Sequence, residues 1–163
     1  MPRDDAALTV LAEAVGSALR AREFRLATAE SCTAGWIAKA ITDVAGSSAW
    51  FDSAAVTYSN AAKMRDLGVA DALLLEHGAV SEAVVGAMAA GMYARSACEA
   101  VIAVSGIAGP DGGTADKPVG LVCFAWLIER VASTERAIFS GDRQAVRRAA
   151  VEFALQGLLS RLD

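Results

Sequence analysis

Residues 100–104 form a continuous apolar run, Ala-Val-Ile-Ala-Val, that passes directly into a glycine-rich loop. Residues 119–128 form a second uninterrupted apolar run. A strand without a polar face must be covered on both sides, which is typical of sheets that carry helices on both faces. Other strand patterns alternate with amphipathic helical patterns along the chain. The sequence therefore predicts an α/β fold, a three-layer α/β/α sandwich with a mixed, mostly parallel sheet of about five strands.

The expected elements follow from the spacing of apolar residues and from the residues that end each run. We expect strands at residues 24–29, 50–59, 100–104, 119–128 and 133–140. We expect helices at residues 5–23, 33–44, 60–67, 71–77 and 81–98, and a final helix that follows Gly141, Asp142 and Arg143. No linker, repeat or low-complexity stretch divides the chain, so residues 1–163 are expected to form one domain.

The composition argues against several classes of protein. The 163 residues carry a formal net charge of −4, which is the wrong sign for a protein that coats nucleic acid. The longest apolar stretch, residues 83–94, is too short for a membrane span, which needs roughly twenty residues. Asp4 and Asp5 stand where a secretory signal would be basic, so we expect no signal peptide and a cytoplasmic location.

Metal and disulfide chemistry are not expected either. The three cysteines, Cys32, Cys98 and Cys123, are odd in number and show no CxxC spacing. His77 is the only histidine, so the usual zinc ligand sets are nearly excluded, and a Ser-His-Asp triad would have to use this one residue. We therefore expect no metal and no cofactor.

Ser31 stands between an expected strand and an expected helix, a place where nucleophilic serines are often found. The alternative is that Ser31 or Thr33 only caps the helix, and this segment alone favours that alternative. No GxSxG motif surrounds the serine. The neighbouring Cys32 could be a reactive thiol, although a structural cysteine is the commoner case.

A nucleophilic serine needs a base, and few residues are available for that role. Lys63 lies in an apolar part of a short expected helix, where partial burial would lower its pKa, although by itself it is more simply explained as a solvated surface lysine. His77 precedes Gly78 and is better explained as a helix-ending residue than as a general base. Tyr58, at the end of an expected strand, is either a half-buried core aromatic or a hydroxyl donor in a cleft.

Two further segments could bind an anion. The loop 106–113 follows a buried strand and could present main-chain N–H groups beside Ser105, although a simple tight turn explains its glycines equally well. Arg143, Arg147 and Arg148 come at the start of the last helix, where their charge opposes the helix dipole. An anionic ligand would explain their position, and salt bridges to acidic neighbours are the structural alternative.

Six short blocks that together span nearly the whole chain carry a family resemblance. In order they are Thr28-Ala-Glu-Ser-Cys-Thr-Ala-Gly35, Gly46-Ser-Ser-Ala-Trp-Phe51, Val56-Thr-Tyr-Ser-Asn-Ala-Ala-Lys63, Gly78-Ala-Val-Ser81, Ser105-Gly-Ile-Ala-Gly-Pro-Asp-Gly-Gly113 with Lys117-Pro-Val-Gly120, and Phe139-Ser-Gly-Asp-Arg143 with Val146-Arg147. The sequence in this respect resembles the CinA C-terminal domain family. Its single-domain members look like nicotinamide mononucleotide deamidases, also called nicotinamide-nucleotide amidohydrolases, which release ammonia and leave nicotinate mononucleotide for NAD synthesis. The resemblance thus implies a small nucleotide as substrate, with no nucleic-acid or membrane partner.

The resemblance also implies a role for each candidate residue. Ser31 matches the catalytic serine, Lys63 matches the lysine that activates it, and Tyr58 is expected close to both. The implied substrate contacts are Glu30, Thr33, Asn60, Ser105, Gly106, Gly109, Arg143, Arg147 and Arg148, with Arg147 or Arg148 on the 5'-phosphate. Relatives look dimeric, so a homodimer is expected, with Trp36 and Trp50 as an exposed apolar surface unless they are buried.

The chain departs from the family pattern at two points. Ala34 stands where many relatives have glycine, so the turn is strained if its backbone needs a positive φ. Longer relatives carry an N-terminal domain that resembles molybdopterin-binding proteins, and we expect this chain to lack that domain and to have deamidase activity only. Two other functions stay open: a non-catalytic, regulatory nucleotide-binding module of the competence or damage-inducible type, and an esterase or peptidase that pairs Ser31 with His77.

Overall fold

The computed structural model describes residues 4–163, so the first three residues of the expected 1–163 domain lie outside the described part. Its helices and strands alternate in the way that the sequence predicts. In chain order they are α1 (Asp5–Ala21), β1 (Leu26–Glu30), α2 (Trp36–Thr42), the short 3-10 helix η1 (Ser47–Ala49), β2 (Phe51–Val56), α3 (Asn60–Leu67), α4 (Asp71–His77), α5 (Glu82–Ser96), β3 (Ala100–Gly106), β4 (Leu121–Ile128), β5 (Val131–Ile138) and α6 (Arg143–Leu162).

A five-stranded sheet in the order β2-β1-β3-β4-β5 forms the middle layer. β1 pairs in parallel with β2 and with β3, whereas β4 runs antiparallel to both β3 and β5. The expected mixed sheet of five strands is confirmed. Parallel pairs make up half of the pairings rather than most of them, because the glycine loop turns the chain back on itself between β3 and β4.

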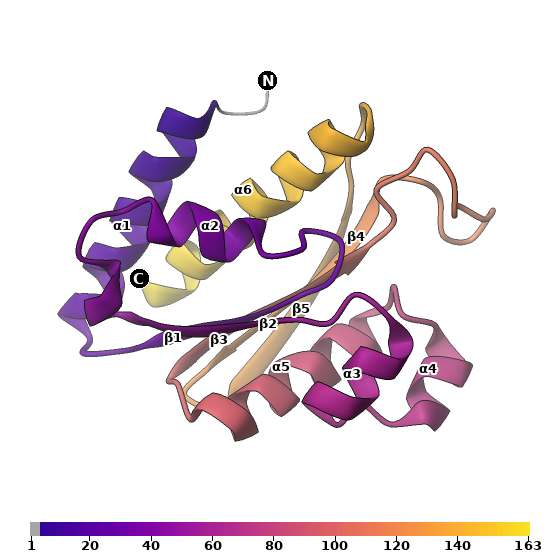
Figure 1. The fold of residues 1–163 in the computed structure, drawn as a ribbon, viewed down its shortest axis with the longest axis horizontal. Coiled ribbons are helices and arrows are strands. Elements are labelled where there is room, and N and C mark those ends of the chain that lie inside the picture. The colour runs from indigo at the N-terminus through magenta and orange to yellow at the C-terminus, as the bar shows by residue number, and fades with distance from the viewer. Residues whose placement is uncertain (1–3) are drawn as a thin grey trace.

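Helices cover both faces of this sheet, as the apolar strands predict (Figure 1). On one face α1, α2 and α6 pack over large side chains such as Leu26, Phe124 and Trp126. On the other face α5 packs closely over small side chains such as Ala29 and Ala103, with α3 and α4 beside it. Successive strand residues point to opposite faces, which is why one strand supplies both cores.

Three local expectations need correction. The segment 33–35 forms turns rather than the first turn of a helix, so α2 begins only at Trp36. The last strand begins at Val131, two residues earlier than expected, because the turn after Ile128 is very short. Trp50 is buried rather than exposed, since its ring packs against Gly16 of α1. Among the helices of the described chain, none has the length and apolar character required to cross a membrane.

The sheet brings three functional segments to one edge. β1, β2 and β3 all end there, at Glu30, Val56 and Gly106. Both α3 and α6 begin at the same edge, because each follows a strand that ends at it. In α/β sheets this edge is where ligands bind, since the strand ends leave loops and helix N-termini exposed.

Candidate active site

Ser31 lies in a tight turn directly after β1. Its N–H donates to Val104 O of β3 at 3.0 Å, and its carbonyl accepts from the N–H of Ala34 at 3.0 Å. Ala34 has a φ of 49° and Gly35 a φ of 91°, so the turn passes through the left-handed region at two successive residues. The strain that the alanine at position 34 was expected to introduce is therefore present.

Glu30 organises this turn from inside the protein. Its fully buried carboxylate accepts from the Thr33 hydroxyl at 2.7 Å and from the backbone N–H groups of Ile37 and Ala38 at 2.9 and 3.1 Å. The Thr28 hydroxyl donates to it as well, at 3.1 Å. Glu30 thus satisfies the first amides of α2, the task that the sequence suggested for Ser31 or Thr33. Glu30 and Thr33 do not line the cavity described below, so the structure places neither at the expected substrate contact.

Lys63 reaches Ser31 from α3. Its Nζ lies 2.9 Å from Ser31 Oγ and 2.7 Å from the carbonyl oxygen of Thr57. The side chain is only 1% exposed, and within residues 4–163 no carboxylate forms an ion pair with it. Burial lowers the pKa of the Lys63 amine, and the neighbouring Cys32 opposes this shift only in part. The surface-lysine alternative is therefore wrong, and the pair has the geometry of a hydroxyl beside its base.

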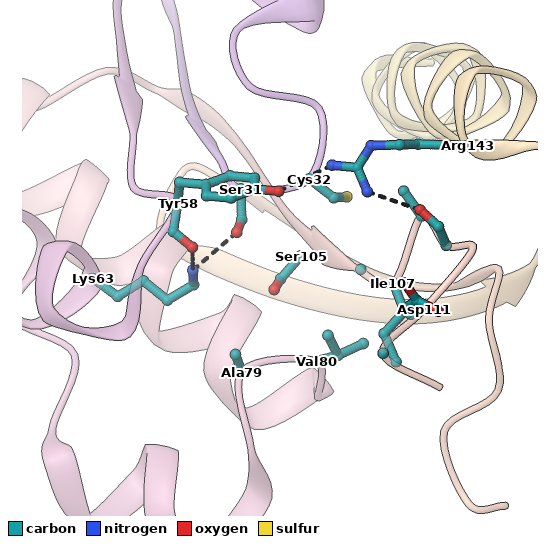
Figure 2. A pocket seen from close by; sticks show the side chains of 14 residues that line it. Ser31, Cys32, Tyr58, Lys63, Ala79, Val80, Ser105, Ile107, Asp111 and Arg143 are labelled. Atoms are coloured by element: carbon teal, nitrogen blue, oxygen red, sulfur yellow. Dashed lines mark hydrogen bonds between the residues drawn. The ribbon is translucent and has the colours of Figure 1, made fainter. Parts of the chain in front are cut away.

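A cavity of about 310 Å³ opens onto this pair, and Figure 2 shows it from close by. Its lining residues come from five separate segments of the chain. They are Ser31, Cys32, Tyr58, Lys63, Ala79, Val80, Ser105, Gly106, Ile107, Ala108, Gly109, Asp111, Gly112 and Arg143. The structure thus brings Ser105, Gly106 and Gly109 to Ser31, as the sequence predicts.

Main-chain N–H groups are available on one wall of the cavity. In the described part of the chain the amides of Ala108, Gly109 and Gly112 donate to no other backbone group. Ser105 is 1% exposed, and its hydroxyl faces the cavity between Lys63 and Ile107. Such donors can stabilise the negative charge that develops on a carbonyl oxygen under nucleophilic attack.

Arg143 spans the cavity mouth. Its Nη1 donates to Gly109 O at 2.8 Å, and its Nη2 donates to the Tyr58 hydroxyl at 3.0 Å. The Tyr58 ring is largely exposed, and it is the backbone carbonyl of this residue that approaches Lys63, at 3.4 Å. Tyr58 is therefore a neighbour of the pair, but its hydroxyl points to the guanidinium of Arg143 rather than to Ser31 (Figure 2).

The other two arginines lie outside this cavity. Arg147 donates to the carbonyls of Cys32 and Thr33, and Arg148 forms an ion pair with Asp5 at 2.8 Å. Both guanidinium groups lie over the Trp36 ring and line a separate cavity of about 380 Å³. The sequence could not distinguish these arginines from Arg143, because all three stand within two turns of the same helix.

Three remaining candidates are also separate from the cavity or chemically inert. Asn60 is exposed and only begins α3, so it does not reach the cavity. His77 ends α4 and lines none of this cavity, so the structure gives no support to a serine–histidine esterase. Burial raises the pKa of the Cys32 thiol to about 12, so this cysteine stays protonated and is not a reactive thiolate.

Sequence reasoning did not single out the wall that Ala79 and Val80 form opposite Ser105 (Figure 2). These residues lie in the connection between α4 and α5, which has no polar side chain in the cavity. The only available signal was the short block of residues 78–81. No group of three or more His, Cys, Asp or Glu side chains that could hold a metal occurs in the described residues.

Comparison with known proteins gives a consistent set of matches. The family model of the CinA C-terminal domain matches residues 8–162. The nicotinamide-nucleotide amidohydrolase PncC of Escherichia coli strain K12 is 54% identical over 155 residues, which cover 94% of each chain. The protein of the same name from Pseudomonas putida is 53% identical over 93% of this chain and 95% of its own length. A crystal structure of the competence damage-inducible protein A from Klebsiella pneumoniae has a TM-score of 0.93 at 42% identity and covers 95% of this chain and 96% of its own.

Proposed function

The chain belongs to the CinA C-terminal domain family, and on that premise we propose that it hydrolyses the carboxamide of nicotinamide mononucleotide to nicotinate mononucleotide and ammonia. Two relatives that are named nicotinamide-nucleotide amidohydrolase share more than half of their residues with it over nearly their whole length. The observation that carries the proposal is the 2.9 Å contact between Ser31 Oγ and Lys63 Nζ at the floor of a cavity. The chain is thus an amidohydrolase of the serine–lysine type.

The reaction begins when the neutral Lys63 amine removes the proton from the Ser31 hydroxyl as Oγ attacks the carboxamide carbon. Amides of the glycine loop, residues 106–113, hold the oxyanion of the tetrahedral intermediate. The Lys63 ammonium then returns its proton to the leaving nitrogen, the C–N bond breaks, and ammonia departs. Water, deprotonated by Lys63, attacks the resulting ester of Ser31, and the carboxylate product leaves with Ser31 protonated again.

We assign the 5'-phosphate of the substrate to Arg143. Among the three arginines that the sequence offered, it is the one whose guanidinium lines the cavity with Ser31. An arginine fork can bind two phosphate oxygens at once, and this one already spans the mouth between Gly109 and Tyr58. Ser105 supplies a further hydroxyl next to the carboxamide.

The direct test is ammonia release from nicotinamide mononucleotide by the purified protein. Wild type should release ammonia, and the variants Ser31→Ala and Lys63→Ala should fall to near background while still binding the nucleotide in calorimetry. A silent wild type that binds the nucleotide would favour the regulatory binding module instead. Variants as active as wild type would remove the serine–lysine assignment.

We further propose that the protein acts as a homodimer in the cytoplasm. The open edge of β5 supports self-association, because Val131 and Ile138 are 73% and 66% exposed on it. The three free, buried cysteines fit a reducing compartment. Light scattering on the eluting protein should give twice the chain mass of 16.8 kDa, and a mass equal to one chain would contradict the dimer.

A further inference from the structure

Arg147 donates hydrogen bonds to the backbone of the turn that carries Ser31. It reaches from α6 and donates from Nε to Cys32 O at 2.9 Å and from Nη2 to Thr33 O at 3.2 Å. Among residues 4–163 the Cys32 carbonyl has no other hydrogen-bond donor. A buried carbonyl without a donor loses free energy comparable to a hydrogen bond, so the turn depends on this arginine.

The two carbonyls fix the peptide planes that follow Ser31. The plane before Ser31 is held by its N–H on Val104 O, and the plane after it by the bond from Ala34 N–H to Ser31 O. Arg147 holds the next plane through Cys32 O, and it adds a second bond to Thr33 O, which also accepts from the N–H of Trp36 at 3.0 Å, at the point where Ala34 takes its positive φ. A turn that passes through the left-handed region needs such external bonds, because other backbone conformations compete with it.

The position of Arg147 argues against a contact with the substrate phosphate. Arg147 does not line the cavity that contains Ser31, and its guanidinium lies over the Trp36 ring, 5.4 Å from the ring centre, where it lines a separate cavity. Burial raises the pKa of the Cys32 thiol, and the nearby charge of Arg147 opposes that shift in part.

We propose that Arg147 is the positioning residue for the nucleophile turn, which holds Ser31 Oγ in line with Lys63 without touching the substrate. This role rests on the proposed amidohydrolase function. A displaced nucleophile slows the chemical step, and an error of about 1 Å can cost about 100-fold in rate. Binding of the nucleotide depends on the cavity walls and on Arg143, so it does not require Arg147.

The test uses the variants Arg147→Lys and Arg147→Gln. The glutamine variant should lower kcat by about 10- to 100-fold and leave KM for nicotinamide mononucleotide nearly unchanged. The lysine variant keeps the charge but cannot reach both carbonyls, so it should recover only part of kcat. Hydrogen exchange at residues 31–35 should accelerate in both variants, whereas exchange in β3 should not.

A matched control exists on the same helix. Arg161 also lies over a tryptophan, Trp126, and also donates to a backbone carbonyl, that of Gly157, but about 20 Å further along α6. Arg161→Gln should leave kcat and KM at the wild-type values. Thermal unfolding of each variant separates a local effect on the turn from a loss of the whole fold. If Arg147→Gln does not fold, the kcat of Arg147→Lys tests the positioning role.

Two results would overturn the positioning role. A large increase in KM with kcat preserved would show that Arg147 binds the phosphate after all. A wild-type kcat in Arg147→Lys, with unchanged hydrogen exchange in the turn, would show that the hydrogen bonds of Arg147 to the two carbonyls are dispensable. Neither result depends on whether the wild-type protein is an amidohydrolase for another nucleotide, whereas a silent wild type would defeat the proposed function itself.

Discussion

Lys63 Nζ lies 2.9 Å from Ser31 Oγ, although the two residues are 32 positions apart and come from different layers of the fold. The same nitrogen lies within hydrogen-bonding distance of two carbonyl oxygens, those of Thr57 and Tyr58. A neutral amine has two N–H donors and one lone pair. With both donors on carbonyls, the lone pair is left for the serine hydroxyl, which is the arrangement that a general base requires.

Replacing Lys63 by arginine tests this arrangement directly. The guanidinium keeps hydrogen-bond donors but stays positively charged and offers no lone pair, because it does not lose a proton in proteins. We expect Lys63→Arg to lower kcat by roughly 10²- to 10⁴-fold, the usual contribution of a general base. Lys39→Arg is the matched control, because Lys39 is an exposed lysine paired with Asp43. Full activity in Lys63→Arg would mean that the lysine acts only as a hydrogen-bond donor.

The rate should rise with pH because the base must be neutral. Burial lowers the pKa of Lys63 below the usual value of about 10.4, so the alkaline form becomes available before free lysine would deprotonate. The pH profile of kcat/KM should therefore rise to a plateau with a midpoint below that value. A profile that falls over the same range would contradict the assignment of Lys63 as the base.

The same shift makes stability depend on pH. The unfolded chain binds the Lys63 proton more tightly than the folded chain, so the contribution of Lys63 to the free energy of unfolding rises with pH between the folded and unfolded pKa values. Lys63→Met should remove this slope. Denaturant unfolding of wild type and variant at several alkaline pH values measures it, and parallel pH dependences of the two proteins would show that the amine is not destabilised by burial.

Arg143 should matter for binding rather than for the chemical step. Hydrogen bonds to a charged group contribute about 1.5–3 kcal/mol, so Arg143→Ala should raise KM for nicotinamide mononucleotide by roughly 10- to 100-fold. The KM of Arg143→Lys should lie between those of wild type and Arg143→Ala, because the charge remains while the planar guanidinium that spans the cavity mouth is lost. An unchanged KM in both variants would move the phosphate away from this residue.

Close packing between α5 and α3 holds Lys63 in place. A Cβ on Gly91 of α5 would lie 1.9 Å from the carbonyl oxygen of Leu67 at the end of α3. Gly91→Ala should therefore lower the free energy of unfolding by about 1–3 kcal/mol or more and reduce kcat, because α3 must move away. Gly86→Ala on the same helix meets only Thr134 Cγ2 at 3.9 Å and should be neutral or stabilising. Equal stabilities for the two variants would contradict this packing.

In the strained turn after Ser31, a substitution by glycine should raise the stability of the protein. Ala34 has a φ of 49°, and the left-handed region costs an alanine about 1–2 kcal/mol. Glycine avoids this cost, but it loses more conformational entropy on folding, which cancels part of the gain. Ala34→Gly should raise stability by up to about 1 kcal/mol, which corresponds to about 2–4 °C in Tm for a chain of this size. Ala97→Gly, at a φ of 55° after α5, is the control and should raise Tm by a similar amount. A lower Tm for Ala34→Gly alone would show that the alanine side chain contributes contacts of its own.

Much of the fold was predictable because its signals are local. Apolar runs without a polar face predict covered strands, and helical spacing predicts the helices that cover them; both recur in the structure with shifts of a few residues. The pairing of Ser31 with Lys63 came from sequence blocks rather than from any periodicity. The antiparallel return of β4 was not predictable in this way, because the direction of a strand after a long loop depends on packing elsewhere in the chain.

The sequence by itself supplied the candidates for chemistry: a serine turn, a lysine in a short helix, a glycine loop and a set of arginines at the start of one helix. Only the tertiary structure decided how they are used. It placed Arg143 at the cavity and Arg147 on the turn, although they are only four positions apart, because one further helical turn brings the side chain of Arg147 over the Trp36 ring. The tertiary structure also buries Glu30, whose carboxylate accepts hydrogen bonds from the first N–H groups of α2. Residue types follow from the sequence, whereas the direction in which each side chain points is set by contacts between distant segments.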